Sequence, residues 1–172
     1  MAHFIHDREI ALAKTDVIVN AANGCGYMGG ETCTSELHRG VAEHLNFYTH
    51  GAMEKEALKV ARKYNKIPSW LIGTKAGNFF VTDSFGLDCK VVIHAVTMRY
   101  PASSSNIKRV AEVVHKIFEY CNSSGYKSIS IPLLGCGTGG LSAEKVAGLI
   151  RNKAAKYPDI DVYIYINREN KL

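Results

Sequence analysis

The sequence contains no long apolar run, no internal repeat and no low-complexity segment. A membrane-spanning helix needs about 20 consecutive apolar residues, and no run approaches that length. Residues 1–7 offer no apolar core of secretory length. The five cysteines form an odd count and no CxxC pair, which does not favour a disulfide framework. These absences predict a cytoplasmic protein without a membrane partner.

Neither the charge nor the histidines point to a polyanion or a metal. The net charge is +5, and the lysines and arginines are scattered without a basic stripe. The seven histidines, including His3 and His6, lack the paired spacing of a zinc motif. We therefore expect a solvated surface with a slight basic excess, which suits an anionic ligand, and no metal site.

Strands and helices are expected to alternate within a single domain over residues 1–172. Short β-branched segments predict five strands, over Asp16–Asn20, Phe79–Thr82, Lys90–Val96, Ser128–Ile131 and Val162–Ile166. Apolar residues at helical spacing predict helices over Met53–Tyr64, Ile107–Cys121 and Ala143–Ile150, and a less regular one over Ser35–Leu45. This order predicts an α/β domain with a largely parallel sheet, whose ligands bind at the carboxyl ends of the strands.

Two glycine-rich loops follow predicted strands, over residues 20–30 and residues 132–141. Glycine lets backbone N–H groups approach an anion without an intervening Cβ. A helix N-terminus behind such a loop adds unsatisfied donors and a partial positive charge. Two facing loops of this kind predict a diphosphate site.

Two common nucleotide-binding motifs match these loops incompletely. Residues 24–29 read GxGxxG, but the acid at the expected distance, Glu43, falls in a helical stretch instead of at a strand end. Residues 135–142 have the frame of a phosphate-binding loop, with Leu141 in place of its lysine. Nucleoside triphosphate hydrolysis is therefore disfavoured. The GxGxxG match keeps a nicotinamide-dinucleotide oxidoreductase as an alternative.

Several segments together resemble the macrodomain family. Thr15–Asn23 is similar to the family's signature ending in N-A-A-N, and Gly73–Ala76, Val92–His94 and Ile131–Gly137 are similar to its central segments and second loop. The order and spacing cover nearly the whole chain. The resemblance implies a three-layer α/β/α sandwich with a mixed, largely parallel central sheet that binds ADP-ribose, with no further cofactor.

The resemblance also implies the ligand-binding positions. They are Glu9, Ile10 and Asn167 at the adenine, Asn20 and Asn23 near the distal ribose, Gly29 and Gly30 in the first loop, and Gly135, Cys136, Gly137, Thr138, Gly139 and Gly140 in the second. The family's usual acid at the adenine is Asp, so Glu9 departs from the pattern, and Asp7 is a rival. Of the two amides after the first strand, one is expected to brace the loop and Asn23 to face the ribose.

Catalysis is less clearly implied. Where one class of family hydrolases carries an Asp, this chain has Cys33 or Thr34. The glycohydrolases that the second loop resembles use a lysine near Met98 and Arg99, and some carry an Asp at Gly139. The candidates are therefore Asn23 and Glu31, with Glu36 and His38 nearby, and with Cys33 and Cys136 as alternative nucleophiles. Glu31 would position or deprotonate a water.

We predict a monomeric ADP-ribosyl hydrolase acting on modified protein, nucleic acid or a small ADP-ribose ester. In this prediction nucleic acid is a partner only as the modified substrate. The alternative is a non-catalytic reader of ADP-ribose or its derivatives.

Overall fold

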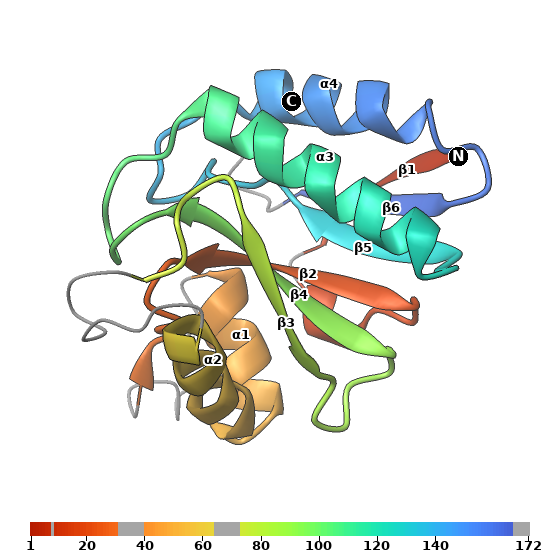
Figure 1. The fold of residues 1–172 in the computed structure, drawn as a ribbon. Helices are drawn as coiled ribbons and strands as arrows, with labels where there is room; N and C mark the ends of the chain where they lie inside the picture. Colours follow the sequence, from red (N-terminus) through yellow and green to blue (C-terminus); the bar gives the residue numbers. More distant parts are fainter. Residues whose placement is uncertain (8, 31–39, 64–72, 167–172) are drawn as a thin grey trace.

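A computed structural model describes residues 1–7, 9–30, 40–63 and 73–166 (Figure 1). Within these ranges six strands form one sheet: β1 (Ala2–Ile5), β2 (Val17–Asn23), β3 (Phe79–Asp83), β4 (Val91–Met98), β5 (Ser128–Pro132) and β6 (Asp161–Tyr165). Their order is β1-β6-β5-β2-β4-β3. The β3 strand is antiparallel to β4, and the other neighbours are parallel. The sheet is therefore mixed and largely parallel, as predicted.

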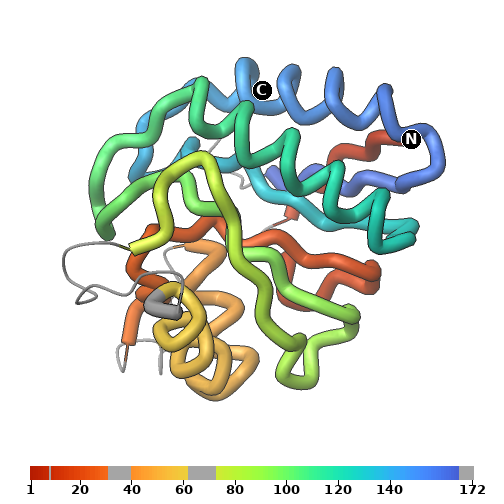
Figure 2. Tube along the Cα trace, viewed as in Figure 1, coloured from red at the N-terminus to blue at the C-terminus, as the bar shows by residue number. Residues whose placement is uncertain are grey.

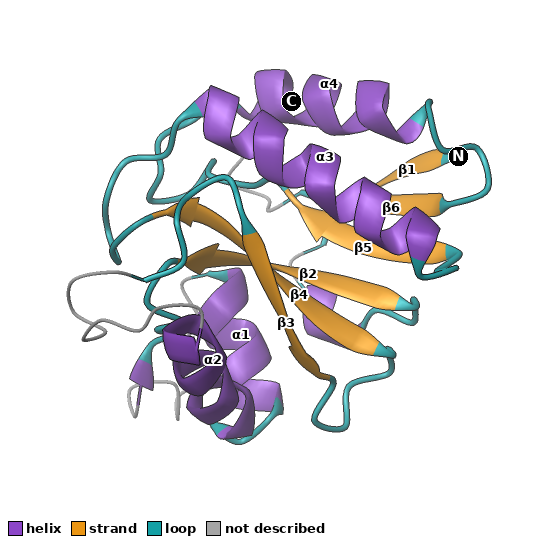
Figure 3. Ribbon diagram, in the orientation of Figure 1, coloured by secondary structure: helices purple, strands orange, loops and turns teal. Residues whose placement is uncertain are grey.

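Helices cover both faces of this sheet. Those described are α1 (Val41–Tyr48), α2 (Ala52–Lys63), α3 (Ile107–Ser123) and α4 (Ala143–Ala154), with a short 3₁₀ helix, η1 (Ile10–Leu12). Figure 3 shows α3 and α4 on one face and α1 and α2 on the other. This confirms the three-layer sandwich. No described helix is long and apolar enough to span a membrane.

Each face of the sheet has its own hydrophobic core, and β2 contributes to both. Val17 and Val19 belong to the cluster with α3 and α4. Ile18, between them, belongs to the cluster with α1 and α2. Successive side chains of a strand point to opposite faces, so a run of apolar residues serves two layers.

The predicted elements differ from the observed ones mainly at their ends. The β2 strand continues to Asn23, so residues 21–23, expected as loop, remain in the ladder. The β1 strand was not predicted; it pairs with β6, near the other end of the chain (Figure 2). The described part of the helix expected over residues 35–45 begins at Val41 and runs to Tyr48. Residues 31–39 lie outside the described ranges.

Candidate functional site

The first glycine loop is tied to the segments beside it. The Gly24 N–H donates to the carbonyls of Met98 (2.9 Å) and Arg99 (3.1 Å), just after β4. The Gly24 carbonyl accepts from the N–H of Thr74 at 2.8 Å. A Cβ at Gly24 would lie 2.3 Å from the Thr74 carbonyl oxygen, so this position requires glycine. The carboxyl ends of β2 and β4 thus form one edge with the segment before β3.

Asn23 braces the loop from within. Its Nδ2 donates to the Tyr27 carbonyl at 2.7 Å, and its Oδ1 accepts from the N–H groups of Cys25 (3.1 Å) and Tyr27 (3.2 Å). Asn23 is 8% exposed, whereas Tyr27 is 45% exposed. The side chain predicted to face the ribose therefore holds the turn in this structure, and a ribose contact remains a prediction.

Asn20, the other amide of the first loop, is buried within the sheet. Its side chain is fully buried, with Nδ2 3.1 Å from Nδ1 of His94. The His94 Nε2 lies 3.0 Å from Oγ1 of Thr82, which itself donates to the Asp83 carbonyl. Burial lowers the pKa of His94 to about 3, so the ring is neutral, with Nε2 donating and Nδ1 accepting. The Asn20 amide therefore pairs through Nδ2 inside the sheet, and its buried Oδ1 has no partner among the described residues, so a contact between Asn20 and the ligand stays a prediction.

A residue that sequence reasoning missed, Glu54 on α2, holds the other end of the first loop. Its Oε1 accepts from the N–H groups of Met28 (2.7 Å) and Gly30 (3.1 Å). Gly29 and Gly30 both have positive φ, which suits glycine. Two N–H groups of this loop are therefore engaged by the protein's own carboxylate.

The second glycine loop, between β5 and α4, presents unused donors. Within the part of the chain that the structure describes, the backbone N–H groups of Gly137, Thr138 and Gly139 donate to no acceptor. Gly137 and Thr138 are exposed. The α4 helix begins directly behind them, with Ser142 as its N-cap. Free N–H groups ahead of a helix N-terminus suit an anion.

Ser105 supports this second loop from the segment before α3. Its N–H donates to the Gly139 carbonyl at 3.0 Å. Its Oγ is buried and has no partner among the described residues. A Cβ at Gly139 would lie 2.3 Å from that Oγ, so the contact leaves no room for a side chain. The next residue, Asn106, is the N-cap of α3.

Cys136, in the same loop, is a poor nucleophile. Burial raises the pKa of its thiol to about 11. The reactive form of cysteine is the thiolate, and a thiol with a pKa of about 11 is almost fully protonated at neutral pH. The burial of Cys136 and its raised pKa thus disfavour it as the alternative nucleophile.

The predicted adenine-side residues lie around η1. The Glu9 Oε2 accepts from Nε2 of His44 at 3.0 Å and lies 3.3 Å from the donating hydroxyl of Tyr48. The Asp7 Oδ1 accepts from the Glu9 N–H at 3.0 Å, so the rival acid supports the start of η1. The Ile10 side chain is 1% exposed and packs in the core. Several predicted residues lie outside the described ranges: Glu31, Cys33, Thr34, Glu36, His38 and Asn167.

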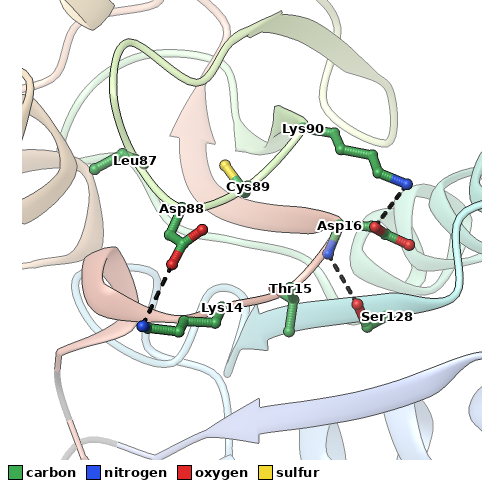
Figure 4. A pocket seen from close by; sticks show the side chains of 8 residues that line it. All are labelled: Lys14, Thr15, Asp16, Leu87, Asp88, Cys89, Lys90 and Ser128. Carbon is green, nitrogen blue, oxygen red and sulfur yellow. Dashed lines mark hydrogen bonds and ion pairs between the residues drawn. The ribbon is translucent and has the colours of Figure 1, made fainter.

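A separate pocket opens at the amino-terminal ends of β2, β4 and β5, away from the glycine loops (Figure 4). Its charged groups pair with one another, Lys14 with Asp88 at 3.6 Å and Lys90 with Asp16 at 2.8 Å. Burial raises the pKa of the Cys89 thiol there to about 11. These groups neutralise each other, so the pocket shows no ligand chemistry comparable to that of the second loop. Among the described residues no group of three or more histidines, cysteines or acids is placed to hold a metal.

The structure is an α/β domain with unused backbone N–H groups at the carboxyl edge of its sheet, among the residues that it describes. The Macro domain family model matches residues 19–150 of this chain. The chain therefore belongs to the macro domain family, which confirms the resemblance seen in its sequence. Macro domains are an ADP-ribose-binding family.

Comparisons with individual proteins agree with this placement. An uncharacterized protein of Aquifex aeolicus is 32% identical over 148 residues, which cover 86% of this chain and 78% of that protein. Human protein mono-ADP-ribosyltransferase PARP14 is 29% identical over 84% of this chain and 7% of its own length. The macrodomain of Mycobacterium tuberculosis DarG superposes with a TM-score of 0.78 at 24% identity, covering 96% of this chain and 97% of that one. At 24% identity, this structural likeness shows that the two chains share a fold.

Proposed function

We propose that this chain binds ADP-ribose at the carboxyl edge of its sheet, with the diphosphate on the second glycine loop. The observation that carries the proposal is the set of unused N–H groups at Gly137, Thr138 and Gly139 ahead of α4. Hydrogen bonds to a charged acceptor contribute about 1.5–3 kcal/mol each. Three such donors and a helix N-terminus suit a diphosphate without a lysine.

Structures of similar proteins support this ligand. The Oceanobacillus iheyensis macrodomain is described with ADP, with a TM-score of 0.75 and 18% identity over 97% of this chain and 84% of that one. Thermosipho africanus DarTG is described in complex with ADP-ribose; this chain matches it with a TM-score of 0.70 at 21% identity, over 95% of this chain and 41% of that one. In the proposed pose the adenine lies toward Glu9, Ile10 and Asn167, and the distal ribose toward Asn23, Gly29 and Gly30.

We further propose that the chain hydrolyses an ADP-ribosyl linkage of a modified protein, a modified nucleic acid or a small ADP-ribose ester. Glu31 follows the glycine pair directly in the sequence and is the proposed general base for a water attacking the C1″ carbon. The bond from C1″ to the acceptor would break and the acceptor would leave with the proton that Glu31 takes from the water, while the second loop holds the diphosphate. For an O-acyl ester of ADP-ribose the same water would attack the acyl carbon. A non-catalytic reader is the second candidate, because Cys33 or Thr34, Met98 or Arg99, and Gly139 stand where family hydrolases carry acids or a lysine.

Calorimetry with ADP-ribose, AMP and NAD tests the binding proposal. We expect tightest binding to ADP-ribose, because AMP lacks the distal ribose and NAD adds a nicotinamide. A clear preference for NAD would favour the oxidoreductase alternative, and no binding of ADP-ribose would overturn the proposal.

Incubation with mono-ADP-ribosylated protein, ADP-ribosylated DNA and O-acetyl-ADP-ribose tests hydrolysis. We expect turnover of at least one substrate, and the Glu31→Gln variant should lower it by about 10²-fold or more while retaining ADP-ribose affinity. Glu56→Gln, at a carboxylate on α2 that pairs with Lys59, is the matched control and should retain turnover. Tight ADP-ribose binding without turnover of any substrate would exclude hydrolysis and leave the reader.

We also infer a single-domain monomer that acts in the cytoplasm. The four described cysteines, Cys25, Cys89, Cys121 and Cys136, carry no disulfide, which suits a reducing compartment. Sedimentation of the purified protein at several concentrations tests the monomer.

A further inference from the structure

The carboxylate of Glu54 lies buried under the first glycine loop. Besides the bonds from Met28 and Gly30, its Oε2 accepts from Nδ2 of Asn46 at 3.2 Å. Glu54 is 8% exposed, and no ion pair joins it to a cation in the described part of the chain. Burying a carboxylate without a counter-ion is costly unless hydrogen-bond donors replace the lost water. Three N–H donors do so here.

The neighbouring helices hold this carboxylate in place. Glu54 lies in the first turn of α2, where the helix dipole favours a negative charge. Its own N–H donates to Oδ1 of Asn46 at 3.3 Å, while the Asn46 amide donates back to its carboxylate. This reciprocal pair ties α1 to α2. The side chain therefore has little freedom to release the loop.

The α2 helix also fixes the middle of the loop by close approach. Gly26 has a positive φ of 76°, and a Cβ there would lie 2.5 Å from the Ala57 carbonyl oxygen. The backbone is thus held against α2 at Gly26 by contact and at Met28 and Gly30 by the Glu54 carboxylate. The carboxylate thus takes up two N–H groups of this loop, whereas in the second loop Gly137 and Thr138 are exposed and their N–H groups have no acceptor among the described residues.

We propose that Glu54 is a positioning residue: its carboxylate holds residues 28–30 in the shape that the ADP-ribose site requires. The inference rests on the proposed ADP-ribose binding, and it adds a residue with no direct ligand contact. It also assigns the two loops different tasks. The second loop binds the anion, and the first loop, held by an internal anion, shapes the sugar side.

Two substitutions of nearly equal length separate hydrogen bonding from packing. Glu54→Gln keeps an Oε1 that can accept both loop N–H groups, although its Nε2 then faces the donating Nδ2 of Asn46, whereas Glu54→Met fills the same space with no acceptor. We expect Glu54→Met to weaken ADP-ribose binding by about tenfold or more and Glu54→Gln by no more than about threefold. Glu56→Gln is the matched control on the same helix. Its carboxylate pairs with Lys59 at the surface, and the variant should bind as the wild type does.

Amide NMR spectra of the ligand-free protein supply a second readout. Loss of the charged acceptor in Glu54→Gln should shift the amide protons of Met28 and Gly30 upfield and leave those of Gly137 and Thr138 unchanged. Wild-type affinity in a folded Glu54→Met variant would overturn the inference. If Glu54→Met does not fold, unchanged Met28 and Gly30 amides in Glu54→Gln would overturn it instead.

Failure of the proposed function gives a different result. If the wild type binds no ADP-ribose, the ADP-ribose role of Glu54 falls with it, but the amide shifts still report whether the carboxylate holds residues 28–30. Both proposals are supported if three results hold. The wild type binds ADP-ribose, the amides of Met28 and Gly30 shift in Glu54→Gln, and Glu54→Met loses affinity.

Discussion

Individual glycines of the second loop serve different physical purposes. Gly135 and Gly140 have φ values of 77° and 73°, a backbone conformation that other residues rarely adopt. Gly139 has no positive φ, but a Cβ there would lie 2.3 Å from Oγ of Ser105 and 2.6 Å from the Gly135 carbonyl oxygen. A Cβ at Gly137 would meet nothing within 4 Å. Glycine is thus required for its backbone conformation at Gly135 and Gly140 and for close approach at Gly139. Neither requirement applies at Gly137.

The contrast between Gly139 and Gly137 yields a prediction for stability. Gly139→Ala should force Ser105 and the Gly135 carbonyl apart and lower the free energy of unfolding by about 1–3 kcal/mol, the range of overpacking. Gly137→Ala, the matched control two residues earlier, should unfold as the wild type does. Urea unfolding followed by circular dichroism measures both. Equal stability of the two variants would contradict the steric reading of Gly139.

Sequence patterns located the two glycine loops but not the residues that brace them. The sequence singled out Asn20 and Asn23 as two amides after a strand. It did not predict the burial of Asn20, because Asn20 lies opposite His94 on β4 and that pairing depends on strand register. Glu54 has a sequence signal that was not used: it shares a helix face with Ala57 and Ala61, which are buried. Ser105 has no such signal, because its partner, Gly139, is distant in the sequence and only the fold joins them.

At the scale of elements, buried strands were predicted well and the edge strand was not. The β2 strand begins with Val17–Val19 and the β4 strand with Val91–Ile93, and such β-branched runs are typical of strands covered on both faces. The β1 strand has only four residues, of which the middle two are exposed. Its place depends on pairing with β6, about 160 residues away, and no local pattern encodes that pairing.

Pairing of β1 with β6 predicts different effects of proline at adjacent positions. The carbonyls of Met1 and Ile5 accept from Val162 and Ile166, each at 2.8 Å. In a parallel pair, successive N–H groups alternate in direction, so the N–H of His3 faces β6 and that of Phe4 faces the open edge. We expect His3→Pro to lose a ladder bond and about 1 kcal/mol or more, and Phe4→Pro to lose less.

Comparison with His3→Ala isolates the backbone effect, because His3 also stacks on Tyr163 with ring centroids 5.3 Å apart. Thermal unfolding of the three variants measures the differences. If Phe4→Pro proves as damaging as His3→Pro, the register of β1 against β6 is not the one described.

At the scale of the whole molecule, the alternation of strands and helices was enough to predict the layers. The apolar surfaces of α2 and α3 must each be covered, and a sheet that is apolar on both faces covers both. Which polar groups lie between the layers could not be predicted, because that depends on strand register. His94 is the clearest example: it is fully buried in the middle of the sheet, stacked on Phe80 with centroids 4.6 Å apart.

The buried, neutral His94 links the stability of the whole fold to pH. Its pKa is about 3 in the folded protein and near 6.5 when exposed, so below pH 6.5 the unfolded chain binds a proton that the folded chain does not. The contribution of His94 to the free energy of unfolding is therefore fully present above pH 6.5. It falls by about 1.4 kcal/mol for each pH unit as the pH drops from 6.5 toward 3. Between pH 7.5 and 4.5 we expect the wild type to lose about 2–3 kcal/mol more than His94→Gln, measured by urea unfolding at both values. The control is His115→Gln, at an exposed position on α3, whose stability should depend on pH as that of the wild type does. An equal loss of stability in the wild type and in His94→Gln would show that His94 does not cause the pH dependence.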